Sequence, residues 1–145
     1  MGASGGAHLL NFDSVQGRWN SDATCINDKI VIDDYKIEYT SIASIEKVEW
    51  GDCDIVLECT GMFRTPEQLQ TFFDHGVKKV IVSAPIKDSA LNIVYGVNDK
   101  EYDPSTHHLL TAASCTTNCL APVIKVVHEN IGIKHGVYTT IHCVT

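Results

Sequence analysis

The fold is decided by residues 54–83, which read DIVLECTGMFRTPEQLQTFFDHGVKKVIVS. Two short and almost continuously apolar runs, residues 54–59 and 79–83, flank a segment with helical periodicity. Parallel strands need a crossover between them, and strands that are buried on both faces are apolar throughout. The stretch therefore predicts a right-handed strand–helix–strand crossover in a parallel sheet that is covered on both faces.

The helix of this crossover carries its own start and stop signals. Thr65 fits the N-cap, Pro66 fits the first helical position, and Gln68 completes a capping-box pattern with Thr65. Gly76 fits the position just after the helix, where a left-handed backbone is common. The expected buried face consists of Leu69, Phe72 and Phe73.

Downstream of the crossover the α/β pattern continues. Residues 92–97 and 108–112 read as two more strands, so the sheet should have at least four. A hydroxyl residue, Ser114, then precedes a helical pattern that begins at Cys115, and residues 136–145 form a last β-prone run. The side chains expected to face the sheet from this helix are Leu120, Val123, Ile124 and Val127.

Upstream, the pattern is weaker. The glycine-rich residues 1–6 read as a flexible start, and residues 8–15 read as a short amphipathic turn in a connection. Residues 29–32 and 35–40 are β-prone on either side of Asp33 and Asp34, which predicts an antiparallel hairpin.

Composition excludes several classes of protein. The chain has 145 residues, enough for one domain, and a formal net charge of −7 with no basic stripe, so nucleic acid is not an expected partner. No apolar run approaches the roughly 20 residues that span a bilayer. No secretory signal opens the sequence, and the six cysteines share no repeated spacing. We therefore expect a cytoplasmic protein with reduced thiols and no membrane partner.

Cys115 is the most promising reactive group. The unpaired N–H groups and partial positive charge of a helix N-terminus favour a thiolate, which is the nucleophilic form of cysteine. Taken alone, Cys115 fits a buried inert thiol at least as well. A zinc site formed by Cys115, Cys119 and His142 is a weaker alternative, because this spacing lacks the paired ligands of structural zinc sites. We predict no metal, and we expect Cys119 to pack on the helix face.

Two motifs resemble the phosphorylating glyceraldehyde-3-phosphate dehydrogenases. They are SCTTNCLAP at residues 114–122 and TTIH at residues 139–142. Further matches follow the order of the family and lie at residues 13–18, 58–63, 82–85 and 94–98. The resemblance therefore covers nearly the whole chain.

The resemblance implies an incomplete Rossmann-type sheet followed by the first strand of a catalytic domain. Residues 1–114 would be a partial NAD-binding domain, and residues 115–145 the start of the catalytic domain. The Gly-x-Gly-x-x-Gly turn that holds the dinucleotide pyrophosphate in the family does not occur here. We expect a middle portion of the family chain, with weak NAD affinity and little turnover by itself. The family is homotetrameric.

The resemblance also assigns roles to individual residues. Cys115 would attack the aldehyde of glyceraldehyde 3-phosphate, His142 would move the proton, and inorganic phosphate would cleave the resulting thioester. The positions that match NAD contacts are Thr60, Gly61, Phe63 and Ser83. The positions that match phosphate contacts are Ser114, Thr116 and Thr145. Two alternatives stay open, namely an erythrose-4-phosphate dehydrogenase and a non-catalytic binding or assembly module.

Overall fold

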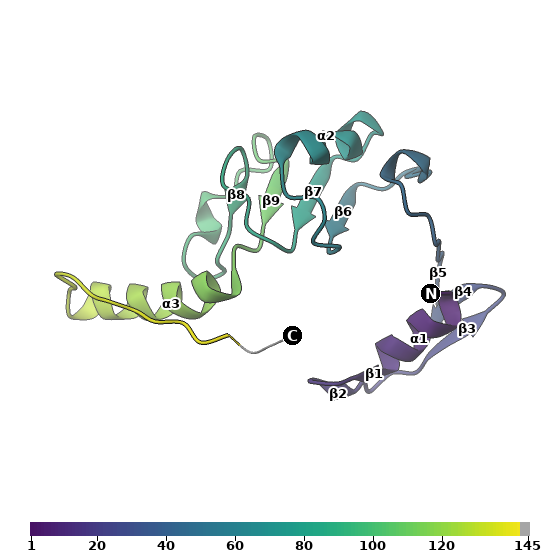
Figure 1. Cartoon of the computed structure of the whole chain (residues 1–145), viewed down its shortest axis with the longest axis horizontal. Coiled ribbons are helices and arrows are strands. Elements are labelled where there is room, and N and C mark those ends of the chain that lie inside the picture. The colour runs from purple at the N-terminus through teal and green to yellow at the C-terminus, as the bar shows by residue number, and fades with distance from the viewer. Residues whose placement is uncertain (143–145) are drawn as a thin grey trace. The chain divides into compact units, whose positions relative to one another are not determined.

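The computed structural model describes residues 1–142 and divides the chain into two compact units, Met1–Val48 and Glu49–Thr145. The elements of the first unit are α1 (Ala3–Asn11), β1 (Phe12–Asp13), β2 (Gly17–Arg18), β3 (Ala23–Ile26), β4 (Lys29–Ile32), β5 (Tyr35–Ile37) and a 3-10 turn at Ile45–Lys47. Those of the second unit are β6 (Ile55–Glu58), α2 (Pro66–Asp74), β7 (Lys79–Val82), β8 (Leu91–Asn92), a 3-10 turn at Asp99–Glu101, β9 (Leu109–Thr111) and α3 (Cys115–Asn130), as Figure 1 shows.

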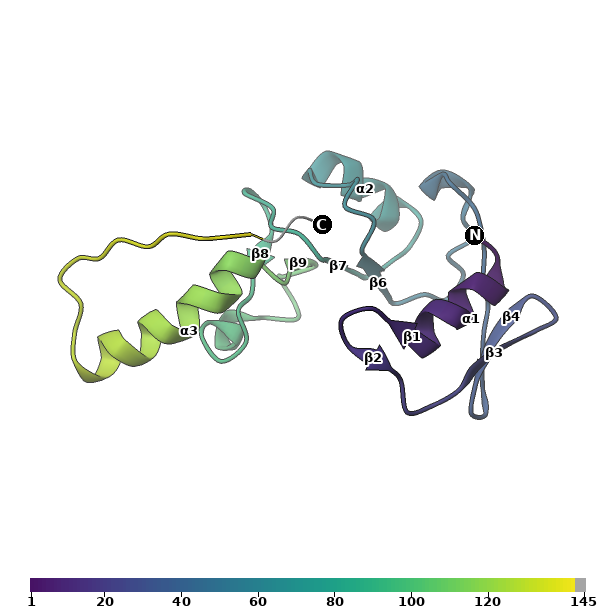
Figure 2. The same ribbon diagram turned by 60° about the horizontal axis from the view of Figure 1, so that its bottom comes forward.

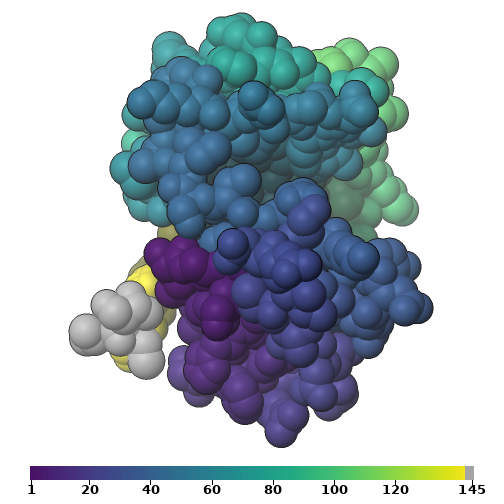
Figure 3. Space-filling view, turned by 90° about the vertical axis from the view of Figure 1, so that its right-hand side faces the viewer, coloured from purple at the N-terminus to yellow at the C-terminus, as the bar shows by residue number. Residues whose placement is uncertain are grey.

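The first unit is a helix packed on a three-stranded antiparallel sheet of order β3-β4-β5. Its surface is seen in purple to blue in Figure 3. The predicted hairpin is confirmed, because β4 and β5 pair around a turn in which Asp33 has a φ of 51°. A second hairpin, between β3 and β4, was not predicted; its turn residues Asn27 and Asp28 have φ values of 52° and 61°.

The prediction of a flexible glycine-rich start is wrong. Residues 3–6 form the first turn of α1, in which Ala3 and Ala7 lie one turn apart and are buried. At Gly6 a Cβ atom would lie 3.0 Å from the ring of Tyr39, so the missing side chain allows a close approach. Packing on the sheet therefore outweighs the low helix propensity of glycine.

The second unit contains the predicted parallel crossover. β6 and β7 pair in parallel from Ile55 opposite Lys79 to Glu58 opposite Val82, and α2 lies between them in the chain. The full sheet has the order β6-β7-β9-β8, and every neighbouring pair is parallel. This is a mixed α/β structure consistent with a partial Rossmann domain.

Helix α2 follows its sequence signals. The Thr65 side chain accepts the backbone N–H of Gln68, and the Gln68 side chain accepts the backbone N–H of Thr65, which completes the capping box. Gly76 follows the helix with a φ of 91°. Leu69 and Phe72 are buried and Phe73 is half-buried, and the helix packs against β7.

One face of β6 is not covered, contrary to the prediction. Val56 and Glu58 are buried, whereas Ile55 and Leu57 are 54% and 66% exposed. The apolar run of β6 thus identifies a strand correctly, but within residues 1–142 no element covers its second face.

The predicted strand at 92–97 is mostly a turn. β8 ends at Asn92, and Asn98 satisfies backbone groups at this point: its Oδ1 accepts the N–H of Val94 at 2.8 Å and its Nδ2 donates to the Asn92 carbonyl at 3.0 Å. The N–H of Gly96 donates to Asp99 Oδ1 at 2.7 Å. Side chains thus take the place of a neighbouring strand.

Helix α3 begins as predicted but is not buried. It starts at Cys115 after the N-cap Ser114, and none of its sixteen residues is buried. Of the four side chains expected to face the sheet, Leu120 is half-buried, and the other three are exposed. Figure 1 and Figure 2 show α3 extending away from the sheet, with the segment after it running back toward its start.

The predicted last strand is absent over residues 136–142, and its remainder at 143–145 lies outside the described residues. Val137 and Ile141 are 99% and 96% exposed, so the alternating pattern has no sheet to join here. Within residues 1–142, no helix is both long enough and apolar enough to cross a membrane.

Candidate active site

The loop from β9 into α3 is fixed by a buried hydroxyl. Thr111, the last residue of β9, is 1% exposed. Its Oγ1 donates to Asn92 Oδ1 at 2.6 Å and accepts the N–H of Ala113 at 2.9 Å. Ala113 has a left-handed φ of 56°, a conformation that costs free energy for a residue with a Cβ. The hydrogen bonds of Thr111 hold this turn, which directs the chain into α3.

The first turn of α3 places Cys115 at the helix start. Ser114 Oγ accepts the N–H of Thr117 at 3.0 Å, as an N-cap does. Asn118 Nδ2 donates to the carbonyls of Ala112 and Ser114, at 2.6 and 2.9 Å. Cys115 is the first helical residue and is exposed, so the prediction of a buried thiol is wrong.

The structure brings Cys115 and His142 to the same cavity. Its volume is about 380 Å³, and α3 and the returning segment line it with Cys115, Thr116, Cys119, Thr139, Thr140, Ile141 and His142. His142 Nε2 lies 3.5 Å from Thr116 Oγ1, a long contact. Within residues 1–142, Cys115 Sγ has no hydrogen-bond partner. The thiol and the imidazole are therefore neighbours across a cavity without a direct hydrogen bond.

Three of the four predicted NAD contacts lie at the carboxyl edge of the sheet. Thr60 and Gly61 follow β6 and Ser83 follows β7, and the Ser83 N–H donates to the Glu58 carbonyl at 2.9 Å. Thr60 and Ser83 are exposed, and Gly61 has a φ of 72°. Ligands of open α/β sheets bind outside this edge, so exposed polar groups here fit a dinucleotide.

The fourth predicted contact, Phe63, faces a different neighbour. Its half-buried ring meets the ring of Phe72 edge-on, with the centroids 6.3 Å apart. Phe63 therefore packs against α2 in this structure.

Two family models match the chain. The model described as glyceraldehyde 3-phosphate dehydrogenase, NAD binding domain, matches residues 1–66, and the C-terminal domain model of the same dehydrogenase matches residues 114–145. The chain belongs to the glyceraldehyde-3-phosphate dehydrogenase family. NAD is therefore the cofactor that the family model names.

Relatives of known identity agree with this family. Glyceraldehyde-3-phosphate dehydrogenase 3 of a Nostoc species is 56% identical over 143 residues, which cover 97% of this chain and 42% of the relative. The dehydrogenases of Geobacillus stearothermophilus and Streptomyces coelicolor are 44% and 43% identical over 141 residues. Each of these matches covers 96% of this chain and 42% of the relative. The chain thus spans less than half the length of these relatives.

The predicted phosphate contacts of this family member lie partly at the start of α3. Ser114 uses its hydroxyl as the N-cap, whereas Thr116 lines the cavity beside His142. Thr145 lies outside the described residues. Unpaired N–H groups at a helix start favour a bound anion. Thr116, in the first turn of α3, lies where its hydroxyl could contact such an anion.

Cys119 does not pack as expected, since it is exposed and lines the cavity one turn after Cys115. Within residues 1–142, no three His, Cys, Asp or Glu side chains lie together in an arrangement that could hold a metal ion.

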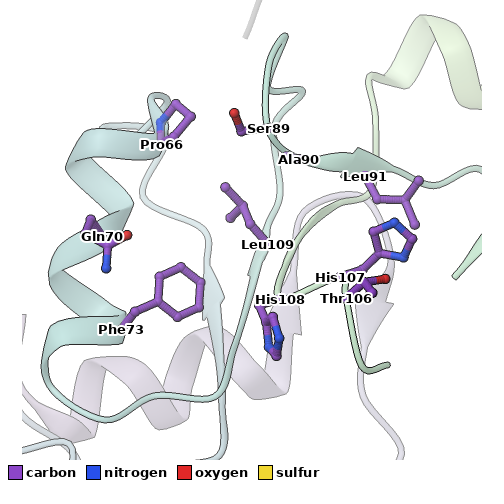
Figure 4. A pocket seen from close by; sticks show the side chains of 10 residues that line it. All are labelled: Pro66, Gln70, Phe73, Ser89, Ala90, Leu91, Thr106, His107, His108 and Leu109. Atoms are coloured by element: carbon purple, nitrogen blue, oxygen red, sulfur yellow. The ribbon is translucent and has the colours of Figure 1, made fainter. Parts of the chain in front are cut away.

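A larger cavity, of about 620 Å³, contains none of the predicted site residues. Figure 4 shows α2 on one side of it and the segments before β8 and β9 on the other. It is lined by Pro66, Gln70, Phe73, Ser89, Ala90, Leu91, Thr106, His107, His108 and Leu109. The sequence interpretation gave its two histidines no role.

Sequence reasoning also missed the residues that support the site. Thr111 and Asn92 fix the turn before Cys115, and nothing in their spacing announces this contact across 19 residues. Glu58 is different, because a charged residue inside an apolar strand is a visible signal.

Proposed function

We propose that this chain supplies the nucleophile, the acid–base histidine and part of the NAD site of a phosphorylating glyceraldehyde-3-phosphate dehydrogenase. The observation that carries the proposal is the cavity shared by Cys115, at the start of α3, and His142. A thiol beside an imidazole at a helix N-terminus is the arrangement that activates a cysteine nucleophile.

The chain's own residues account for the chemical steps. The Cys115 thiolate forms a bond to the aldehyde carbon, and the N–H groups at the start of α3 stabilise the negative charge on the oxygen. After protonation gives a thiohemiacetal, His142 removes the hydroxyl proton as the hydride leaves carbon. NAD, when bound, accepts that hydride. An oxygen of inorganic phosphate then attacks the thioester carbon, which releases the Cys115 thiolate and an acyl phosphate.

Binding is assigned to two groups of residues. We propose that Thr60, Gly61 and Ser83 contact NAD at the carboxyl edge of the sheet, with Phe63 at its border. The proposed phosphate contacts are Ser114, Thr116 and Thr145. The exposure of Thr60 and Ser83 and the position of Thr116 in the cavity support these roles.

The domain boundary proposed from the sequence has residues 1–114 in a partial NAD-binding domain and residues 115–145 at the start of the catalytic domain. The ranges matched by the two family models support it. A cytoplasmic location stays a prediction.

Thiol labelling tests the proposed nucleophile. Cys25, Cys59, Cys115 and Cys119 are all exposed, so accessibility alone predicts similar alkylation rates. We expect iodoacetamide to modify Cys115 fastest at neutral pH, as peptide mass spectrometry would show. The His142→Ala variant should slow Cys115 and leave Cys25, the matched control in the first unit, unchanged. Equal labelling of the four thiols contradicts the proposal.

Turnover separates the enzymatic alternatives from a non-catalytic module. We expect little NADH from this chain with glyceraldehyde 3-phosphate, NAD and phosphate, because the Gly-x-Gly-x-x-Gly turn that holds the dinucleotide pyrophosphate in the family does not occur in this sequence. NADH formation that disappears in Cys115→Ser would instead show a working enzyme. Erythrose 4-phosphate in the same assay tests the rival substrate.

A further inference from the structure

Glu58 connects the two strand ends that carry the proposed NAD contacts. It is the last residue of β6 and is 3% exposed. Its Oε1 accepts the backbone N–H of Thr60 at 2.8 Å and also the Thr60 hydroxyl. Its backbone carbonyl accepts the N–H of Ser83 at 2.9 Å. One buried residue thus holds both an exposed turn and the end of the neighbouring strand.

The turn that rests on Glu58 is closed by further hydrogen bonds. Thr60 Oγ1 accepts the N–H of Met62 at 3.1 Å, and Arg64 Nε donates to the Gly61 carbonyl at 2.8 Å. Gly61 has a left-handed φ of 72°, which glycine adopts without strain. The hydroxyl of Thr60 is shared between Glu58 and Met62, so the carboxylate orients the group that accepts the Met62 N–H.

The second carboxylate oxygen of Glu58 has no evident structural use. Glu58 Oε2 is buried and has no hydrogen-bond partner among residues 1–142. A buried carboxylate oxygen without a partner costs free energy, and an apolar side chain of similar size is often at least as stable in such a place. A group that destabilises the fold at a proposed ligand edge points to a functional role.

We infer that Glu58 is a positioning residue for the cofactor, which holds the Thr60–Gly61 turn in the shape that receives NAD. This inference rests on the proposed function. Glu58 itself does not touch the ligand, because its side chain is covered; it acts through the amide and hydroxyl of Thr60.

Two substitutions at Glu58 separate positioning from folding. The Glu58→Met variant keeps the volume but removes both acceptors, and we expect roughly tenfold faster amide exchange at Thr60 and Met62 and a roughly tenfold higher Kd for NAD. Its urea midpoint should stay equal or rise, since an unpaired buried carboxylate is gone. In Glu58→Gln the amide oxygen accepts the same two bonds, so exchange and Kd should stay within about threefold of wild type.

A neighbouring strand residue provides the control for general destabilisation. Val56 is buried two residues before Glu58 on the same face of β6. The Val56→Ala variant should lower the urea midpoint because it leaves a small cavity, while exchange at Thr60 and the NAD Kd remain at wild-type values. If Glu58→Met does not fold, Thr60→Ala is the second variant. It removes the hydroxyl that accepts the Met62 N–H, and because Thr60 is exposed the substitution should not disturb the core.

The outcomes distinguish this inference from the proposed function. Wild-type exchange at Thr60 and Met62 in Glu58→Met overturns the inference, whether or not NAD binds. Unchanged exchange at Met62 in Thr60→Ala does the same. Suppose exchange is fast in Glu58→Met but neither wild type nor any variant binds NAD. Glu58 then holds the turn in shape, and the proposal that the turn contacts NAD is overturned. Fast exchange together with a raised Kd supports both.

Discussion

Helices α2 and α3 begin in the same way and end in different surroundings. Each follows a hydroxyl N-cap, Thr65 for α2 and Ser114 for α3. The face of α2 that contains Leu69 is fully buried against the sheet, whereas no residue of α3 is buried. The difference shows that local sequence decides where a helix begins, while burial depends on elements that lie elsewhere in the chain.

The largest expected effect comes from shortening one apolar side chain in each helix. Leu69→Ala removes a fully buried side chain from α2 and should lower the free energy of unfolding by about 2–5 kcal/mol. Ile124→Ala, at a 44% exposed position of α3, should change it by no more than about 0.5 kcal/mol. Urea unfolding of the two variants measures both values. If Ile124→Ala lowered the free energy of unfolding as much as Leu69→Ala, the claim that α3 is not packed into the core would be wrong.

The N-caps give a smaller effect with a different readout in each helix. Loss of either cap, in Thr65→Ala or Ser114→Ala, should cost about 1 kcal/mol. Because α2 is part of the core, loss of the Thr65 cap should lower the free energy of global unfolding. Because no residue of α3 is buried, loss of the Ser114 cap should instead open the first turn locally, with faster amide exchange at Thr117 and Asn118.

Ser114→Thr is the matched control for the cap of α3, since it keeps a hydroxyl acceptor, and its exchange rates should stay close to those of wild type. Slow exchange at Thr117 in Ser114→Ala would show that the hydroxyl does not hold the first turn.

Features set by nearby residues were predictable. The capping box of α2, the hairpin around Asp33 and the start of α3 at Cys115 depend on residues within a few positions, and the structure confirms them. The hairpin turn at Asn27 and Asp28 carried the same kind of signal and was overlooked.

Features set by distant residues were not predictable. Gly6 lies in α1 where Tyr39 and Ile30 come close to it, a contact that its neighbours in the sequence do not reveal. Where a strand was predicted at 92–97, the side chain of Asn98 bonds the backbone of Asn92 and Val94. The run at 136–142 alternates like a strand, but no described strand pairs with it.

The candidate site divides in the same way. The resemblance of two motifs to the family pointed to Cys115 and His142, and the returning segment after α3 brings them to one cavity. Thr111 and Glu58 support the site through hydrogen bonds of their buried side chains. The contact of Thr111 with Asn92 spans 19 residues and has no signal in the sequence. The contact of Glu58 with Thr60 is local, and a charged residue inside an apolar strand marks it.

The smallest expected effect is the pH dependence of stability that comes from one acidic residue, which separates the first turn of α2 from that of α3. The first turn of α2 contains Glu67, whereas that of α3 has no acidic residue. Hydrogen bonds from its own backbone N–H and from the Thr65 hydroxyl hold the pKa of Glu67 below its usual 4.5. A carboxyl whose pKa is lowered by folding contributes stability above its unfolded pKa and loses it as the pH falls through the folded value.

The Glu67→Gln variant isolates this contribution from the other acidic groups. It should be slightly less stable than wild type near neutral pH. The difference should shrink as the pH falls below the ordinary pKa of 4.5 and vanish once the pH is below the lowered pKa of Glu67 in the folded protein. Because Glu67 is fully exposed, solvent screening keeps the difference small. Urea midpoints of both proteins across this pH range, with an NMR titration of the Glu67 carboxyl, measure it. A Glu67 titration at the ordinary pKa, or a constant difference at all pH values, would show that α2 and α3 begin with equivalent electrostatics.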